Sequence, residues 1–164
     1  MIKIILFYGS VISILMTLNI LLSLWINPRM WIQDLPEKLR KKIPPKTKAE
    51  KLQTLLVLLP FMILFFLGPV IAITDVLDIS PLKPDFIHSL LIAYGINLIF
   101  NLMDLLVIDW LVICTITPEF ARIPGIEIGE IRDYRKHGID FLKGLFIIVI
   151  PSLISGSAGY WINT

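Results

Sequence analysis

Two aspartates, Asp104 and Asp109, lie inside an otherwise apolar segment from Phe86 to Thr117, whereas the other long apolar segments contain no charged residue. A carboxylate inside a membrane-spanning segment costs free energy unless it is paired, hydrated or used in a function. Carboxylates in such a position bind cations, relay protons or act as general acids and bases. The two residues therefore predict a functional site and leave its reaction open.

Two further sets of polar residues have helical spacing around these aspartates. Tyr94, Asn97, Asn101 and Asp104 are spaced 3, 4 and 3 residues apart, and so are Glu127, Glu130, Tyr134 and His137. Each set is predicted to share one face of a helix. Asp109 lies five residues after Asp104, about 140° further round an α-helix, so the two carboxylates need not face the same site.

Three kinds of chemistry fit these residues. A divalent metal ion, the one cofactor suggested, would be held by Asp104, Asp109, Glu127 and His137, although no HExxH motif supports it. An ion or other substrate would be bound or transported by a larger polar set: Asn97, Asn101, Asp104, Asp109, Glu127 and Tyr134. An enzyme would use His137 and Asp109 as catalytic acid–base groups. The alternative to all three is a structural role, in which the carboxylates form ion pairs with nearby bases: Arg122, Arg132, Arg135 and Lys136.

The composition places these residues in a membrane protein. Hydrophobic residues make up 56% and charged residues 17% of the chain, whereas about 25% of a soluble domain is charged. Charge-free runs cover 4–28, 52–74, 86–103 and 144–164, and about 20 apolar residues suffice to cross the hydrocarbon layer as a helix. We therefore predict an all-α membrane protein with one transmembrane domain, residues 1–164, and four spans at about 4–26, 52–74, 86–114 and 141–162.

The charged connections predict the orientation of the spans. Connection 27–51 has eight bases against three acids, connection 75–85 has one base against three acids, and connection 118–143 again has five bases. Because basic connections stay in the cytoplasm, loops 27–51 and 115–140 are predicted to be cytoplasmic and both termini to lie outside.

The first connection has the pattern of a short helix lying on the membrane. Asp34 and Glu37 have the spacing of a capping box, and apolar residues recur every four positions: Trp31, Leu35, Leu39 and Ile43. The segment Lys38–Lys48 supplies a basic face, which favours contact with anionic lipid. No base-stacking module accompanies it, so we do not expect a nucleic-acid partner.

A set of short motifs resembles a family of small four-helix integral membrane proteins of bacteria and archaea. The family pattern is an Asp before Ile-Asp-Trp-Leu, then Ile-Pro-Gly-x-Glu, then Tyr-x-x-His; it matches Asp104, Asp109, Glu127, Tyr134 and His137. Ile126 stands where the family has Thr. The resemblance implies the cell membrane of a prokaryote and names no substrate.

The sequence favours a protein that binds or transports a cation, a proton or a small solute. Four helices leave little room for a pathway inside one chain, so a homo-oligomer is expected. Two alternatives remain: an intramembrane, metal-dependent enzyme acting on a lipid or isoprenoid headgroup, and a non-catalytic assembly or immunity partner held by its helices.

Overall fold

The computed structural model describes residues 1–79 and 85–162 and confirms an all-α membrane protein. Four helical segments are long and apolar enough to cross a membrane: Ile2–Ile26, Lys48–Asp75, Phe86–Ile116 and Ile128–Ile162. Residues 80–84 of the connection 75–85, which entered the orientation argument, lie outside the described residues.

The spans are built from seven of the helical elements in the described residues. The first is α1 (Ile2–Ile26), the second is α3 (Lys48–Ile79), and the third is α4 (Phe86–Met103) continued by η2 (Asp104–Ile116). The fourth contains α5 (Ile128–Ile131), α6 (Tyr134–Ile147) and α7 (Val149–Ile162). Three more short elements lie in the connections: η1 (Pro28–Asp34), α2 (Glu37–Arg40) and η3 (Glu119–Ala121).

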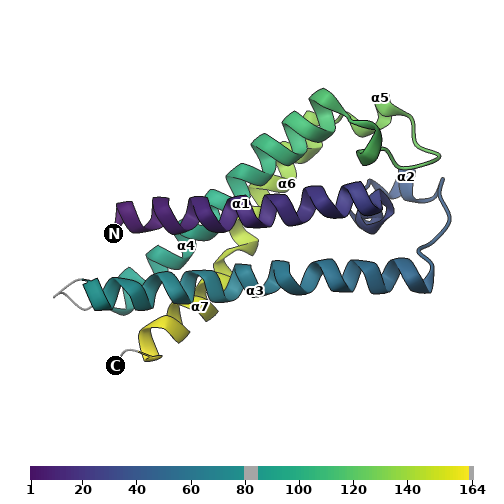
Figure 1. The fold of residues 1–164 in the computed structure, drawn as a ribbon. Coiled ribbons are helices and arrows are strands. Elements are labelled where there is room, and N and C mark those ends of the chain that lie inside the picture. Colours follow the sequence, from purple (N-terminus) through teal and green to yellow (C-terminus); the bar gives the residue numbers. More distant parts are fainter. Residues whose placement is uncertain (80–84, 163–164) are drawn as a thin grey trace.

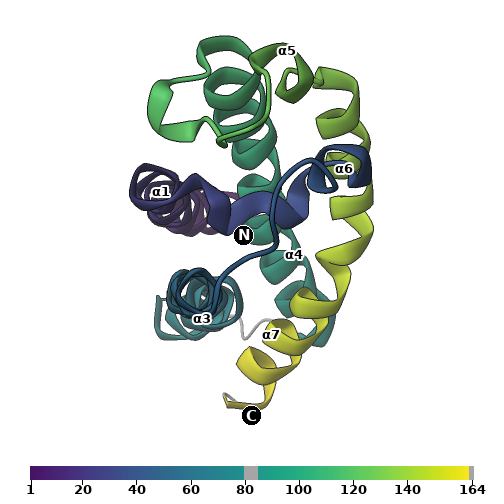
Figure 2. The ribbon, with the colours of Figure 1, turned by 90° about the vertical axis from the view of Figure 1, so that its right-hand side faces the viewer.

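The two ends of the bundle differ in character. Both termini lie at one end, and the elements of the two basic connections, including α2 and α5, lie together at the other (Figure 1). Seen from that second end, the first connection crosses the bundle between α1 and α6 before it enters α3 (Figure 2). The two basic connections therefore share one surface, as the charge pattern requires.

Apolar packing between α1, α3 and α4 forms the main core. Its buried residues include Met16, Ile73, Ile92 and Ile96, and Phe61 and Phe65 pack against it. The outward side chains of the spans are also apolar, as in Leu55, Leu56, Leu59 and Ile63 of α3. Because apolar side chains cover both the inside and the outside of these helices, they suit a bilayer rather than water.

The third span changes its helical geometry at Asp104. From there to Ile116 the chain is a π-helix, in which hydrogen bonds join residues five apart. The backbone N–H of Thr117 donates to the carbonyl of Val112 at 2.7 Å, and Thr115 Oγ1 donates to the carbonyl of Trp110 at 2.7 Å. Residues five apart then lie almost in line along the helix, so the α-helical estimate of 140° between Asp104 and Asp109 is wrong.

The first connection is not one amphipathic helix. It contains the seven-residue 3₁₀-helix η1 and the four-residue α2, separated by Leu35 and Pro36 in extended conformation. Proline disfavours helical geometry in the residue before it, which explains the break. The apolar stripe faces protein: Leu39 and Ile43 are buried, and Ile43 packs with Ile32 and Ile123. Asp34 does not cap α2, which begins after Pro36 without a side-chain cap.

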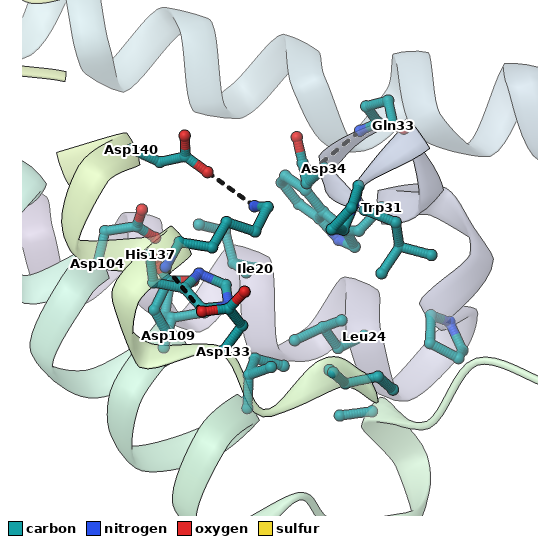
Figure 3. Close-up of a pocket in the computed structure, with 18 of the residues that line it drawn as sticks. Ile20, Leu24, Trp31, Gln33, Asp34, Asp104, Asp109, Asp133, His137 and Asp140 are labelled. Atoms are coloured by element: carbon teal, nitrogen blue, oxygen red, sulfur yellow. Dashed lines mark hydrogen bonds and ion pairs between the residues drawn. The ribbon is translucent and has the colours of Figure 1, made fainter. Parts of the chain in front are cut away.

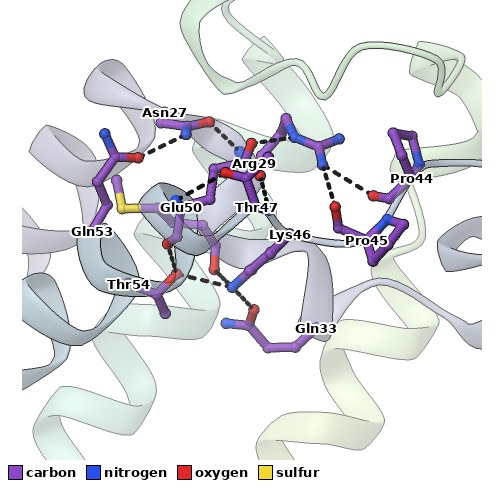
Figure 4. Close-up of polar contacts among 11 residues, drawn as sticks. Asn27, Arg29, Gln33, Pro44, Pro45, Lys46, Thr47, Glu50, Gln53 and Thr54 are labelled. Carbon is purple, nitrogen blue, oxygen red and sulfur yellow. Dashed lines mark hydrogen bonds and ion pairs between the residues drawn. The ribbon is translucent and has the colours of Figure 1, made fainter.

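A polar network fastens this connection to the start of α3 (Figure 4). Arg29 Nε lies 2.5 Å from Glu50 Oε1, and Arg29 Nη2 donates to the carbonyl of Pro44 at 3.0 Å. Lys46 Nζ donates to Thr54 Oγ1 at 3.0 Å and to Gln33 Oε1 at 2.5 Å. One guanidinium therefore holds both ends of the connection.

Arg29→Ala is expected to release the first connection and to lower the free energy of unfolding, because hydrogen bonds to charged groups are lost. The reason is that Glu50, only 13% exposed, loses its ion-pair partner. Hydrogen exchange read by mass spectrometry should speed up across 28–46. Lys41→Ala is the control, because its pair with Glu37 is exposed on both sides and such pairs contribute little. Equal exchange in both variants would contradict the prediction.

Candidate functional site

A cavity of about 530 Å³ opens at the end of the bundle that carries the basic connections. Its volume lies within the range of small-molecule sites. Three elements supply most of its polar lining: Asp34 comes from η1, Asp104 and Asp109 from η2, and Asp133, Lys136, His137, Asp140 and Lys143 from α6 and its N-cap. Figure 3 shows Asp34 beside Trp31 on one side and Asp104, Asp109, His137 and Asp140 on the other.

The π-helix brings both predicted aspartates to this cavity, and α6 adds the histidine. Asp109 Oδ1 lies 2.9 Å from His137 Nδ1, with 21% and 15% of the two side chains exposed. When Nδ1–H is donated to Asp109, Nε2 is the ring nitrogen that remains to accept a proton. Three residues predicted from the sequence, Asp104, Asp109 and His137, thus line one site.

Asp104 differs from its neighbours because its carboxylate has no polar partner in the described part of the chain. Among residues 1–79 and 85–162, no hydrogen bond or ion pair is formed by its carboxylate, which is enclosed by the protein and partly open to the cavity. The charged groups that act on it most are the like-charged Asp109 and Asp34. An enclosed carboxylate in such surroundings is stable only when a cation or a proton neutralises it.

The charges around the cavity do not balance. Its lining contains six carboxyl groups, two lysines and one histidine: Asp34, Asp104, Asp109, Glu130, Asp133, Asp140, Lys136, Lys143 and His137. Both lysines pair with the same residue, since Lys136 Nζ and Lys143 Nζ lie 2.7 and 2.8 Å from the Asp140 carboxylate. The lysines are thereby engaged away from Asp104, and the cavity as a whole attracts positive charge.

The asparagines of the predicted polar stripe lie outside the cavity. Asn97 Nδ2 donates to Ser152 Oγ at 3.1 Å, and Asn101 Nδ2 donates to the carbonyl of Phe141 at 3.2 Å. Tyr94 follows the same pattern, with its hydroxyl 3.4 Å from the carbonyl of Leu145. These side chains join the third span to the fourth, so only Asp104 of the stripe reaches the site.

Glu127 and Tyr134 also lie away from the cavity lining. The chain turns at Asp133, whose side chain accepts from the N–H of Lys136 and begins α6 as a new helix. Glu127 therefore belongs to α5, where it forms a capping box with Glu130, while the Tyr134 hydroxyl lies 2.9 Å from Thr115 Oγ1. The prediction of one continuous helical face from Glu127 to His137 is wrong.

The structure gives no geometric support to the predicted metal site. Within the described part of the chain, no group of three or more His, Cys, Asp and Glu side chains is placed to hold a metal ion. Glu127 lies at the N-cap of α5 and outside the cavity lining, so only Asp104, Asp109 and His137 of the four predicted ligands share the cavity.

The ion pairs expected between carboxylates and arginines are replaced by other contacts. Arg132 Nε donates to Thr117 Oγ1 at 2.9 Å, and Arg122 Nε donates to the carbonyl of Thr117 at 3.2 Å. Both arginines bind the end of η2, where carbonyl groups lack helical partners. Glu130 does pair with a base, but with Lys42 of the first connection at 2.5 Å.

Sequence reasoning missed five charged residues of the cavity lining: Asp34, Asp133, Lys136, Asp140 and Lys143. Asp140 lies three residues after His137 and four after Lys136, a spacing that places all three on one face of a helix. This spacing in the sequence is sufficient to predict that Asp140 lies beside His137 and Lys136. Asp34 was interpreted as a helix cap, and only the break at Pro36 turns it toward the cavity.

Asp34 is the carboxyl that faces Asp109 and Asp140 across the cavity. Enclosure raises the pKa of the Asp34 carboxyl above its ordinary value; Lys136 and Lys46 oppose this shift, and the carboxylates of Asp109 and Asp140 add to it. The charged form is therefore held at a cost in the folded protein. That cost is fully present above the raised pKa and disappears as the pH falls through it.

Asp34→Asn is accordingly expected to stabilise the protein at neutral pH, by less than about 1 kcal/mol because the group is partly in water. The gain should vanish as the pH falls below the ordinary Asp range of about 4. Thermal unfolding of the detergent-purified protein, at neutral pH and at a pH below about 4, measures the difference in stability between the variant and the parent. Glu37→Gln, an exposed carboxyl paired with Lys41, should show no such gain. A loss of stability in Asp34→Asn at neutral pH would refute the expectation.

Comparison of the chain with protein-family models, with curated proteins and with solved structures finds no match. The function is therefore argued from the cavity and its residues.

Proposed function

We propose that this integral membrane protein binds a cation or a proton at Asp104 and transports it through the membrane. The observation that carries the proposal is the carboxylate of Asp104, enclosed beside an acidic cavity without a partner among the described residues. A bound cation or proton supplies the missing positive charge. Asp109 and His137, paired at 2.9 Å, hold or release a proton next to it.

Buried polar atoms along α1 and α4 support a hydrated route away from the cavity. Ser13 Oγ, Thr17 Oγ1 and Asn97 Oδ1 are buried and have no hydrogen-bond partner in the described residues. They lie on the same helices as the cavity residues Ile20 and Phe100, toward the opposite end of the bundle. Buried polar groups of this kind are commonly satisfied by internal water. At that opposite end, the Tyr8 hydroxyl donates to Asp75.

The surroundings of the site follow from the charge pattern. We place the basic connections and the cavity at the cytoplasmic face of a prokaryotic cell membrane. Lys38, Arg40, Lys41 and Lys48 are exposed there, which supports contact with anionic lipid. The proposed protein is a homo-oligomer, because four helices leave little room for a transport route inside one chain. Light scattering of the detergent-purified protein tests the oligomer.

The decisive experiment measures cation and proton flux in proteoliposomes. Vesicles containing the purified protein are loaded with a pH-sensitive dye, and flux is followed after a pH jump with Na⁺ or K⁺ on one side. Faster flux than in empty vesicles supports the proposal. Flux equal to that of empty vesicles under every gradient contradicts it.

A second candidate function is acid–base catalysis on a lipid or isoprenoid headgroup, and the Asp109–His137 pair favours it. A carboxylate that orients an imidazole is the arrangement of many general bases. The acidic excess of the lining opposes binding of an anionic headgroup. Turnover of lipid by the purified protein, lost in His137→Ala, would favour the enzyme over the transporter.

A further inference from the structure

We propose that the cation is a lipophilic organic cation, in which an ammonium or phosphonium group is bonded to apolar groups about the size of an aromatic ring. This inference rests on the proposed function and adds the substrate class. The cavity joins two surfaces that such a molecule needs, an acidic lining and an apolar lining, within one space of about 530 Å³.

The indole of Trp31 forms one wall of the cavity in a fixed orientation. Its Nε1 donates to Ser23 Oγ at 2.7 Å, and Ser23 Oγ in turn donates to the carbonyl of Ile20 at 2.6 Å. Figure 3 shows Trp31 beside Asp34, facing the side that carries Asp104 and Asp109. An organic cation between the two sides would contact carboxylates on both and an aromatic face on one, and aromatic faces attract cations.

Two phenylalanines extend the apolar lining. Phe61 of α3 and Phe100 of α4 both line the cavity, and their rings meet edge to face with centroids 5.4 Å apart. Ile20 and Ile108 continue this surface. A proton or an inorganic ion makes no use of an apolar wall, whereas the hydrocarbon part of an organic cation gains free energy by leaving water for it.

Asp104 selects the charge of the ligand, and the aromatic residues select its body. The carboxylate has no partner among the described residues, so an incoming cation forms an ion pair without first breaking one. An anion of the same shape would meet the excess of carboxylates and be repelled. The site therefore discriminates between two ligands that differ only in the sign of their charge.

The test uses tetraphenylphosphonium and tetraphenylborate, which have nearly the same shape and opposite charge. Equilibrium binding of each ion to the purified protein in detergent is measured separately, and the binding to empty detergent micelles is subtracted. We expect tetraphenylphosphonium to bind at least tenfold more tightly than tetraphenylborate. Asp104→Asn should weaken phosphonium binding at least tenfold. Trp31→Leu should weaken it roughly three- to thirtyfold, the range of a cation–aromatic contact.

Matched controls separate recognition from partition into the apolar surface. Trp25→Leu removes an exposed tryptophan that does not line the cavity, and Glu119→Gln removes an exposed carboxylate; both should bind within twofold of the parent. If Trp31→Leu has no cooperative thermal unfolding, Phe61→Leu takes its place. Equal binding of the two ions, or equal losses in Trp25→Leu and Trp31→Leu, would overturn the inference.

The two proposals fail in different ways. If Asp104-dependent flux of protons or inorganic ions is found and tetraphenylphosphonium does not bind, the substrate class is wrong and the transport site stands. If neither flux nor binding depends on Asp104, both proposals are overturned.

Discussion

Asp104→Asn is expected to reduce cation or proton flux in proteoliposomes at least tenfold while leaving the stability of the fold unchanged or slightly higher. Asparagine has nearly the shape of aspartate and no charge, so the ligand loses its counter-charge and the cavity keeps its volume. The substitution breaks no contact, because the carboxylate has no hydrogen bond or ion pair within the described residues. Removal of an enclosed, unpaired charge also removes a cost to folding.

The combination of lost flux and retained stability identifies a functional carboxylate. A structural carboxylate behaves in the opposite way, since its loss leaves a partner unsatisfied and lowers the free energy of unfolding. Asp109→Asn provides that contrast: it weakens the contact with His137 Nδ1 by replacing the carboxylate with a neutral amide, so flux and stability should fall together. Glu119→Gln, an exposed carboxylate away from the cavity, should change neither. Normal flux in Asp104→Asn would remove the basis of the proposed function.

The four spans follow from the sequence because their signal is local. A charge-free run of about 20 residues is stable in a bilayer as a helix, because a helix satisfies its own backbone hydrogen bonds. The meeting of Asp109 with His137 was also accessible, since the charge pattern places both near the same surface. Their 2.9 Å separation agrees with that expectation.

The geometry that unites the two aspartates was not accessible from the sequence. A π-helix differs from an α-helix in its hydrogen-bond register, and the apolar run Leu105–Ile108 is compatible with both. The α-helical repeat therefore predicts Asp109 on another face than Asp104, whereas the π-helical repeat brings both residues to the cavity. Extended π-helical geometry is rare and frequently marks functional sites, which agrees with its position along the cavity wall.

Polar spacing does not distinguish two uses of a polar side chain that have the same pattern. Asn97 and Asn101 were predicted to bind a substrate, and in the structure they hydrogen-bond the fourth span. Helical spacing identifies a shared face and does not reveal whether that face meets a ligand or another helix. Only the placement of the fourth span decides between them.

The second prediction with a large effect concerns that fourth span. Gly156→Ala is expected to lower the free energy of unfolding by roughly 1–3 kcal/mol, the cost of overpacking a tight interface. A Cβ at this position would lie 3.0 Å from Leu90 Cα and 3.2 Å from Leu90 N, and the backbone of α4 cannot move aside as a flexible side chain does. Unfolding in increasing concentrations of SDS, followed by circular dichroism, measures the change.

Gly138→Ala gives the matched comparison, and its expected effect has the opposite sign. Gly138 lies inside α6, and a Cβ there would meet no atom within 4 Å, so alanine gains up to about 1 kcal/mol of helix propensity. Equal effects of the two variants would contradict the close packing of α7 on α4.

The packing of α7 on α4 also supports the site. The hydrogen bond from Asn97 to Ser152 depends on it, and α7 follows directly on α6, which carries His137. Gly156→Ala is therefore expected to loosen the Asp109–His137 pair and to reduce flux together with stability, unlike Asp104→Asn, which should reduce flux alone.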